Sequence, residues 1–223
     1  MKIDKQVKIS EGAENSILKL VAGLDRHVSP NLKVLIKEST NKEALKDMEG
    51  VGGYCPAPNF IQISIDKDNT KFKADPVGAI TRSFAHELYH AMRYFNGSSA
   101  PDGSLLDCVV DEGLADQFVF ETFHELPVWN KDLSDKISDE LLELFLKTKT
   151  EKVNDDNYND WFIKGSSDKN IPRWAGYSLG LKIVRSYQKK HRINSVLELL
   201  SMSSLDIVNT VLDASVKKNE YKR

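Results

Sequence analysis

Residues 80–95, which read ITRSFAHELYHAMRYF, carry the clearest structural pattern in this chain. Their apolar side chains recur at every third or fourth position, which is the spacing of one face of an α-helix. The pattern predicts a long helix that begins near Pro76 and ends near Gly97. One face of this helix can pack on a core, while the opposite face carries His86 and His90 toward a cleft.

The two histidines are four residues apart, so both imidazoles lie on one side of the helix and can bind the same metal ion. Glu87 projects beside such an ion, where it can accept a proton from a metal-bound water. A catalytic zinc takes three protein ligands and keeps one position open for water. We therefore expect one Zn²⁺ per chain and a third ligand elsewhere.

A second helix, expected from about Asp102 to His124, offers Glu112 as that third ligand. Asp107 and Asp111 lie on the same helix and are the alternatives. Asp116 favours Glu112, because it lies one turn further on the same face and can accept the second ring N–H of a ligand histidine. The small residues Gly113 and Ala115 would let this helix approach the first closely.

The rest of the chain predicts an α+β fold: a small N-terminal β-sheet with a helix, the zinc-binding helix pair, and a mostly helical C-terminal lobe. We expect strands at residues 32–37 and 60–65, joined through a Gly- and Pro-rich turn at 50–59 as a hairpin. Further helices are expected at 10–28, 133–146, 174–187 and 193–212, and an exposed loop at 148–160. Residues 1–97 and 98–223 would form two lobes of one compact catalytic domain.

Composition excludes several classes of partner. The chain has 31 Lys and Arg against 33 Asp and Glu, a net charge of -2, so it has no global field for nucleic acid or anionic membranes. No apolar run is long enough to span a bilayer, and residues 1–8 lack the apolar core of a secretory signal. A cytoplasmic location is expected, with Cys55 and Cys108 as reduced thiols that are not nucleophiles.

The histidine and acidic stretches resemble the HExxH zinc peptidases with a glutamate as third ligand, the gluzincin clan, which includes the thermolysin-like enzymes. The resemblance implies a zincin-like fold, Glu112 as ligand and Asp116 as partner of His86. The chain is more closely similar to a bacterial family of predicted zinc-dependent proteases. That likeness would cover nearly the whole chain and rests on residues 86–90 (HELYH), 112–116 (EGLAD) and 172–180 (PRWAGYSLG).

Two further features follow from the resemblance. Gluzincin sites need a donor from a later helix to steady the oxyanion, and Tyr177 is the expected donor, with Tyr187 and His191 as alternatives. Residues 60–65 would be the edge strand that pairs with an extended peptide. The glycine-rich element that anchors the substrate amino terminus in aminopeptidases is absent, which leaves internal and terminal cleavage both open.

These observations predict a zinc-dependent metallopeptidase that hydrolyses a peptide or protein substrate through a zinc-bound water activated by Glu87. The alternative is a zinc-binding regulatory or interaction protein on a peptidase-like scaffold without turnover. A third reading is a zinc-free helical interaction protein. Glu87 beside an open zinc position favours the enzyme, because a structural zinc is normally closed by four protein ligands.

Overall fold

The computed structural model describes residues 1–98, 103–131 and 133–209. The chain divides into two units. Unit 1 comprises Met1–Gly97 with Phe118–Trp129, and unit 2 comprises Ser98–Gln117 with Asn130–Arg223. Helix α5 (Leu105–Phe123) begins in unit 2 and ends in unit 1.

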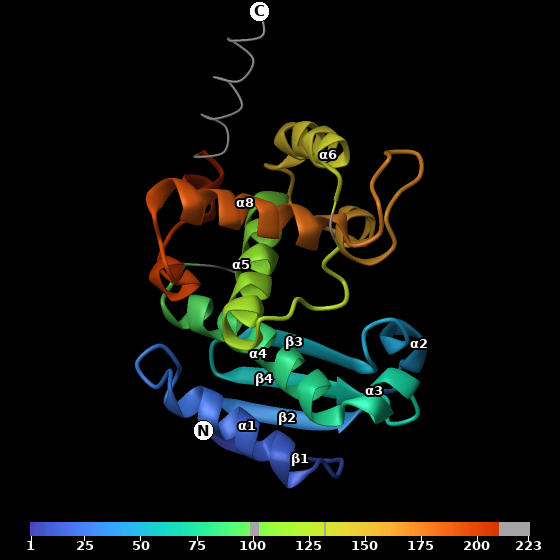
Figure 1. Ribbon diagram of the computed structural model, residues 1–223, viewed down its shortest axis with the longest axis vertical. Helices are drawn as coiled ribbons and strands as arrows, with labels where there is room; N and C mark the ends of the chain where they lie inside the picture. Colours follow the sequence, from blue (N-terminus) through green and yellow to red (C-terminus); the bar gives the residue numbers. More distant parts are fainter. Residues whose placement is uncertain (99–102, 132, 210–223) are drawn as a thin grey trace, which may run out of the picture. The chain divides into compact units, whose positions relative to one another are not determined.

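The expected α+β class is confirmed. Unit 1 contains a four-stranded mixed sheet in the order β1-β2-β4-β3 (Figure 1). The strands are β1 (Lys2–Lys5), β2 (Lys33–Glu38), β3 (Val51–Ala57) and β4 (Phe60–Ile65). β1, β2 and β4 are mutually parallel, whereas β3 runs antiparallel to β4. Alternate β4 residues are buried, namely Ile61, Ile63 and Ile65, as the period of a strand requires.

Two expectations about the sheet were wrong. Residues 60–65 are not an edge strand, because β4 pairs with β2 on one side and β3 on the other. The strands at 32–37 and 60–65 do not form a hairpin either, since β2 and β4 are parallel. The Gly- and Pro-rich segment expected to be only a turn forms the edge strand β3. Pro56 is tolerated there because an edge strand has unpaired N–H positions, and the register shifts between Tyr54 and Ala57.

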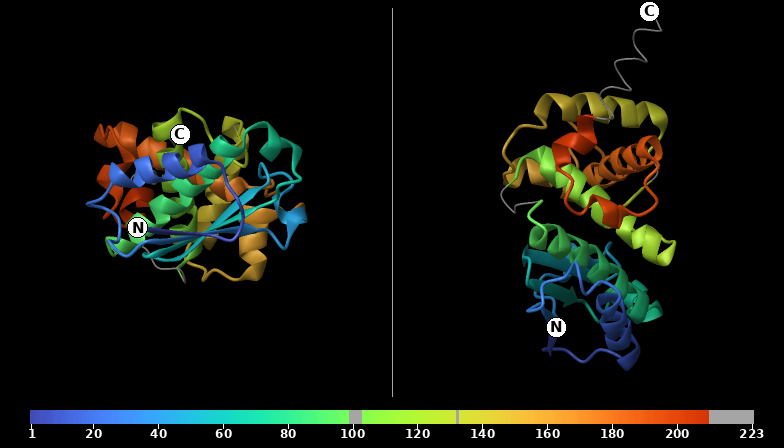
Figure 2. Two further views of the ribbon diagram at one scale, coloured as in Figure 1. Left: turned by 90° about the horizontal axis from the view of Figure 1, so that it is seen from below. Right: turned by 90° about the vertical axis from the view of Figure 1, so that its left-hand side faces the viewer.

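Helix α4 (Pro76–Phe95) is the long helix predicted from residues 80–95. Asp75 caps its start by accepting a hydrogen bond from the Gly78 N–H at 2.9 Å, and proline occupies the first turn. α4 packs against β3 and β4, and α1 (Glu11–Ala22) packs against α4 (Figures 1 and 2). The side chains of residues 79–93 are all buried except for part of Arg82.

Arg82 fixes α4 within unit 1. Its guanidinium donates to both carboxylate oxygens of Glu49 at 3.2 Å, to Asp75 at 3.2 Å and to Glu125 at 3.1 Å. These partners lie in the turn before β3, at the start of α4 and in the segment after α5. The Arg82 Nη2 atom alone donates to both Glu49 oxygens, which adds directional hydrogen bonds to charge attraction. Arg82 therefore connects α4 to two other parts of the unit and also to its own N-cap residue, Asp75.

Unit 2 is mostly helical, as expected. It holds the start of α5, α6 (Asp135–Thr148), α7 (Asp155–Tyr158), a π-helical turn (Asn159–Ile163), α8 (Ala175–His191) and a 3₁₀ turn (Val196–Leu199). The loop expected at 148–160 is partly wrong, because Asn154 and Asn157 form a capping box that starts α7. The helix expected at 193–212 is replaced by the short turn and a helical stretch at 204–209; residues 210–212 lie outside the described ones. Within the described part of the chain, no helix is long and apolar enough to span a membrane.

The small residue Gly113 faces a different helix from the one expected. A Cβ on Gly113 would lie 2.6 Å from the Leu181 backbone N and closer still to the Gly180 carbonyl group. A Cβ on Gly180 would lie 3.0 Å from the Gly113 N and closer still to the Val109 carbonyl oxygen. Gly113 therefore lets α5 approach α8, because the two backbones touch where neither residue has a side chain.

Candidate metal centre

His86 and His90 lie one turn apart on α4 and direct the same ring nitrogen toward each other. Their Nε2 atoms are 3.2 Å apart, and their ring centroids are 4.9 Å apart with the planes at 78°. Two nitrogens bound to one tetrahedral zinc at about 2.0–2.1 Å would be separated by about 3.3 Å. The pair of imidazoles therefore has the spacing that one ion requires.

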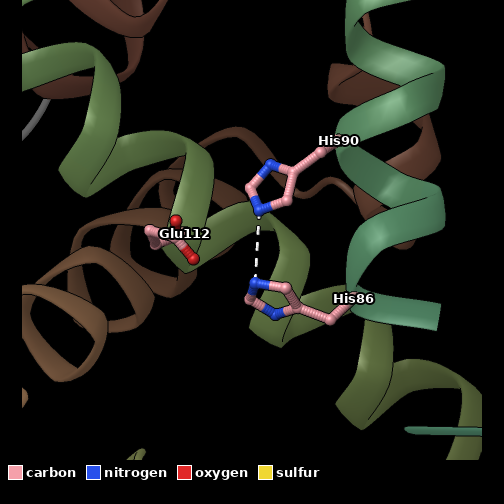
Figure 3. Close-up of side chains that lie close together, drawn as sticks. All are labelled: His86, His90 and Glu112. Carbon is pink, nitrogen blue, oxygen red and sulfur yellow. Dashed lines mark hydrogen bonds between the residues drawn. The ribbon is translucent and has the colours of Figure 1, made fainter. Parts of the chain in front are cut away.

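Glu112 of α5 completes the cluster. One ligand atom from each of His86, His90 and Glu112 lies within 4.8 Å of the other two (Figure 3). Among the described residues, no other three His, Cys, Asp or Glu side chains converge in this way, so the cluster excludes Asp107 and Asp111. Two imidazoles and one carboxylate are a donor set of catalytic zinc sites. This set could hold one metal ion.

Aromatic side chains support both imidazoles. Trp129 is buried and meets the His86 ring edge-on, with centroids 5.5 Å apart and planes at 90°. Tyr94 stacks on His90 at 6.5 Å. Tyr89 packs on Phe118 at 5.5 Å, which joins α4 to the last part of α5. The sequence alone does not single out Trp129, because it lies in the segment after Pro127 and belongs to no periodic pattern.

Glu87 lies against the edge strand β3. Its side chain is only 8% exposed. A Cβ on Gly53 would lie 2.6 Å from the Glu87 Cδ atom and closer still to its Cγ and Oε1 atoms. The Glu87 carboxyl group therefore occupies the space where a side chain at position 53 would begin. This contact could not be predicted from the sequence, in which Gly53 belongs to a Gly- and Pro-rich segment typical of turns.

Asp116 is fully buried on α5, one turn after Glu112. The Asn130 side-chain amide donates to the Asp116 Oδ2 atom at 2.8 Å and to the Tyr177 carbonyl oxygen at 3.3 Å. Asn130 thereby links Asp116 to the start of α8. It was not singled out from the sequence, where a lone asparagine after Trp129 carries no motif. The pairing of Asp116 with His86 remains a prediction.

The three candidate oxyanion donors occupy opposite ends of α8. Tyr177 lies in the first turn, buried, with its ring edge-on to Phe162 at 5.4 Å. Tyr187 lies near the other end, where its hydroxyl contacts the Met202 sulfur at 3.7 Å and its ring stacks on His191 at 4.3 Å. At about 1.5 Å of rise per residue, the two groups are separated by more than two helical turns. Tyr177 and Tyr187 therefore cannot both donate to the same oxyanion.

Both cysteines are free thiols, as expected. Burial raises the pKa of the Cys108 thiol to about 12, and the charge of Glu112 adds to the effect. Burial also raises the pKa of the Cys55 thiol far above its usual range, with a further contribution from the charge of Glu87. The thiolate is the reactive form, so neither cysteine is a nucleophile near neutral pH.

We expect iodoacetamide to alkylate neither cysteine of the native protein at pH 8. A thiol with a pKa of about 12 is ionised only to about one part in ten thousand at that pH. The thiolate fraction rises only as the pH approaches the raised pKa. Mass spectrometry should therefore show no adduct on the native chain and two adducts after unfolding in urea. Rapid modification of the native protein would contradict the burial of Cys55 or the raised pKa of the half-buried Cys108.

Comparison with known proteins supports this reading. Residues 7–209 match the model of a family described as "Predicted Zn-dependent protease (DUF2268)". The uncharacterized protein YjfC of Bacillus subtilis (strain 168) is 26% identical over 214 residues, covering 86% of this chain and 67% of that protein. The comparison with solved structures found no significant match to the chain.

Proposed function

Because this chain belongs to the family of predicted Zn-dependent proteases, we propose that it is a zinc-dependent metallopeptidase that hydrolyses peptide bonds. The observation that carries the proposal is the convergence of His86, His90 and Glu112. These three residues would hold the ion. A zinc ion bound there would supply a water of lowered pKa and would polarise the peptide carbonyl.

Glu87 is the general base in this proposal. It follows His86 directly in the sequence, and its buried side chain lies against the β3 backbone at Gly53. It accepts a proton from the attacking water and delivers that proton to the amine that leaves. A single carboxylate can carry out both transfers because it is regenerated at the end of the cycle.

Buried neighbours of the ligands orient them. Asp116 would accept the second ring N–H of His86, which fixes the imidazole tautomer and increases its basicity. Asn130 holds the Asp116 carboxylate by a hydrogen bond of 2.8 Å. Trp129 packs edge-on against the His86 ring and limits its rotation. The ligands would then be preorganised before the metal binds.

Tyr177 is the proposed oxyanion donor. α5 and α8 touch at Gly113 and Gly180, next to the ligand Glu112 and less than one turn from Tyr177. The backbone carbonyl of Tyr177 is also linked to the Asp116 carboxylate, because the Asn130 side chain donates a hydrogen bond to each of them. Tyr187 and His191 lie at the far end of the same helix, where Tyr187 contacts Met202. A phenol at the near end can donate to developing negative charge on the carbonyl oxygen.

The substrate is proposed to be an extended peptide that adds a strand to the outer edge of β3. β3 is the terminal strand of the sheet and runs past Glu87. Backbone pairing of this kind gives affinity with little preference for sequence. We therefore assign to Val51–Ala57 the substrate-pairing role that the sequence alone had assigned to residues 60–65.

Metal analysis of the full chain without a histidine tag tests the proposal. The wild-type protein should carry about one zinc per chain, and His90→Ala and Glu112→Ala should lose it, because two remaining ligands bind zinc far more weakly. His27→Ala and Glu143→Ala are matched controls outside the cluster and should retain the metal. A wild-type protein without zinc, or zinc retained by both cluster variants, would overturn the metal site.

Turnover separates the enzyme from a regulatory protein. The zinc-loaded chain should cleave members of a peptide library, with the cleaved bonds identified by mass spectrometry. Full zinc occupancy without any cleavage would instead support a zinc-binding module on a peptidase-like scaffold.

A further inference from the structure

Two adjacent glycines of β3 face opposite sides of the sheet. Successive positions in a strand alternate between its faces. A Cβ on Gly52 would lie 2.7 Å from the Leu45 Cδ2 atom, at the end of a flexible side chain. A Cβ on Gly53 would meet the Glu87 side chain at its Cγ, Cδ and Oε1 atoms. Only the second glycine borders the proposed catalytic base.

Gly53 is needed for space and not for backbone conformation. The glycines with positive φ are Gly50, Gly97 and Gly165, so the backbone at Gly53 suits any residue. The space beside Gly53, in contrast, excludes a side chain. Real Cβ atoms essentially never come within 3.0 Å of a neighbouring atom, and the nearest Glu87 atoms would all lie within that distance of a Cβ at position 53. Any larger residue must displace either β3 or Glu87.

The strand is the less movable of the two. Gly53 pairs with Ile63 of β4, which is fully buried and lies in the interior of the sheet. Glu87 is attached to a helix that Arg82 connects to Glu49 and Glu125, but its carboxyl group ends a side chain with three rotatable bonds. The lowest-cost response to a side chain at position 53 is therefore rotation of Glu87 away from its place.

We infer that Gly53 is a positioning residue for Glu87: the bare backbone of β3 at this position admits the carboxylate and sets where it lies. The inference rests on the proposed function, in which Glu87 moves the protons. A shift of about 1 Å in a reacting group can cost about a hundredfold in rate. Both helix α4 and strand β3 would thus determine the catalytic geometry.

The test compares Gly53→Ala with the control variant Gly23→Ala, which adds a methyl group at an exposed position at the end of α1, in the zinc-loaded full chain. Gly53→Ala should lower kcat by about 10- to 100-fold and change KM by less than about threefold, because the base is misplaced while the substrate still binds. Gly23→Ala should keep the wild-type kcat, because a Cβ at position 23 makes only ordinary contacts of 3.7 Å and 3.9 Å with backbone atoms of its own helix end. Both variants should keep the wild-type zinc content and similar melting temperatures.

A second measurement does not depend on activity. Crystal structures of both variants should show the Glu87 carboxyl group displaced in Gly53→Ala and unmoved in Gly23→Ala. An unmoved carboxyl group with wild-type kcat in Gly53→Ala, or an equal loss of kcat in both variants, would overturn the inference. If the wild-type protein cleaves no peptide, the proposed function fails, and the position of Glu87 in the crystal structures tests the inference by itself. A displaced Glu87 carboxyl group in Gly53→Ala would support the positioning role, and an unmoved carboxyl group would overturn it.

Discussion

Exchange of Glu87 for glutamine is expected to lower kcat for peptide hydrolysis by about 10²- to 10⁴-fold, which is the usual contribution of a positioned general base. Glutamine has the shape of glutamate and fits the same space against Gly53, but its amide cannot accept a proton from water. The zinc content should remain at the wild-type level, because Glu87 is not part of the His86, His90 and Glu112 cluster. Steady-state kinetics and metal analysis on the same preparation check both statements.

A matched exchange keeps this result interpretable. Glu143→Gln changes the same functional group on an exposed face of α6 and should leave kcat unchanged. Equal activity in Glu87→Gln and the wild type would contradict the assigned base and would point to a contaminating protease. Loss of zinc in Glu87→Gln would show instead that the carboxylate holds the metal or the fold of the site.

The centre of the site was predictable because it depends on local geometry. Two histidines four residues apart on a helix share a face wherever that helix lies in the fold. The capping residue Asp75 and the apolar spacing after it place α4 at Pro76–Phe95, close to the limits expected from sequence. Glu112 required only one more assumption, that the next helix returns toward the first. Its convergence with His86 and His90 agrees with that assumption.

The sheet was less predictable because strand order is a non-local property. β1 (Lys2–Lys5) is only four residues long and has a single apolar residue, Ile3, so its sequence gives no strand signal and its pairing with β2 determines its conformation. β3 contains two glycines and a proline, which are typical of turns. Gly53 is explained only by Glu87 on α4, a contact that cannot be read from the neighbouring residues.

The small residues on α5 predicted the helix packing only in part. Gly113 correctly indicated a close approach of α5 to another helix, but a glycine does not specify which helix approaches it. Gly180 on α8 is the complement that the structure identifies. The motif at residues 172–180 therefore combines a proposed donor, Tyr177, with a glycine that serves packing. This pairing of glycines leads to the largest stability effect that we expect.

Replacement of Gly180 by alanine should destabilise the protein by about 3 kcal/mol or more, at or above the upper end of overpacking effects. The added Cβ would lie 3.1 Å from the Gly113 Cα atom and closer to the Val109 carbonyl oxygen. Both are backbone atoms inside α5, so no rotamer change can relieve the clash and the helices must separate. At about 2–4 °C per kcal/mol for a chain of this size, the melting temperature should fall by about 6–12 °C.

Gly12→Ala is the matched control, because it also adds one methyl group to a helical glycine. Gly12 lies in α1, and its Cβ would make ordinary contacts at 3.7 Å with Val77 and 3.8 Å with Ser10. That exchange should stabilise the protein by about 0.4–1 kcal/mol, since alanine loses less conformational entropy in a helix than glycine does. Opposite signs for the two exchanges would show that the clash, and not the loss of a glycine, destabilises Gly180→Ala. A wild-type melting temperature in Gly180→Ala would mean that α5 and α8 do not touch at these glycines, and it would remove the argument that places Tyr177 near Glu112.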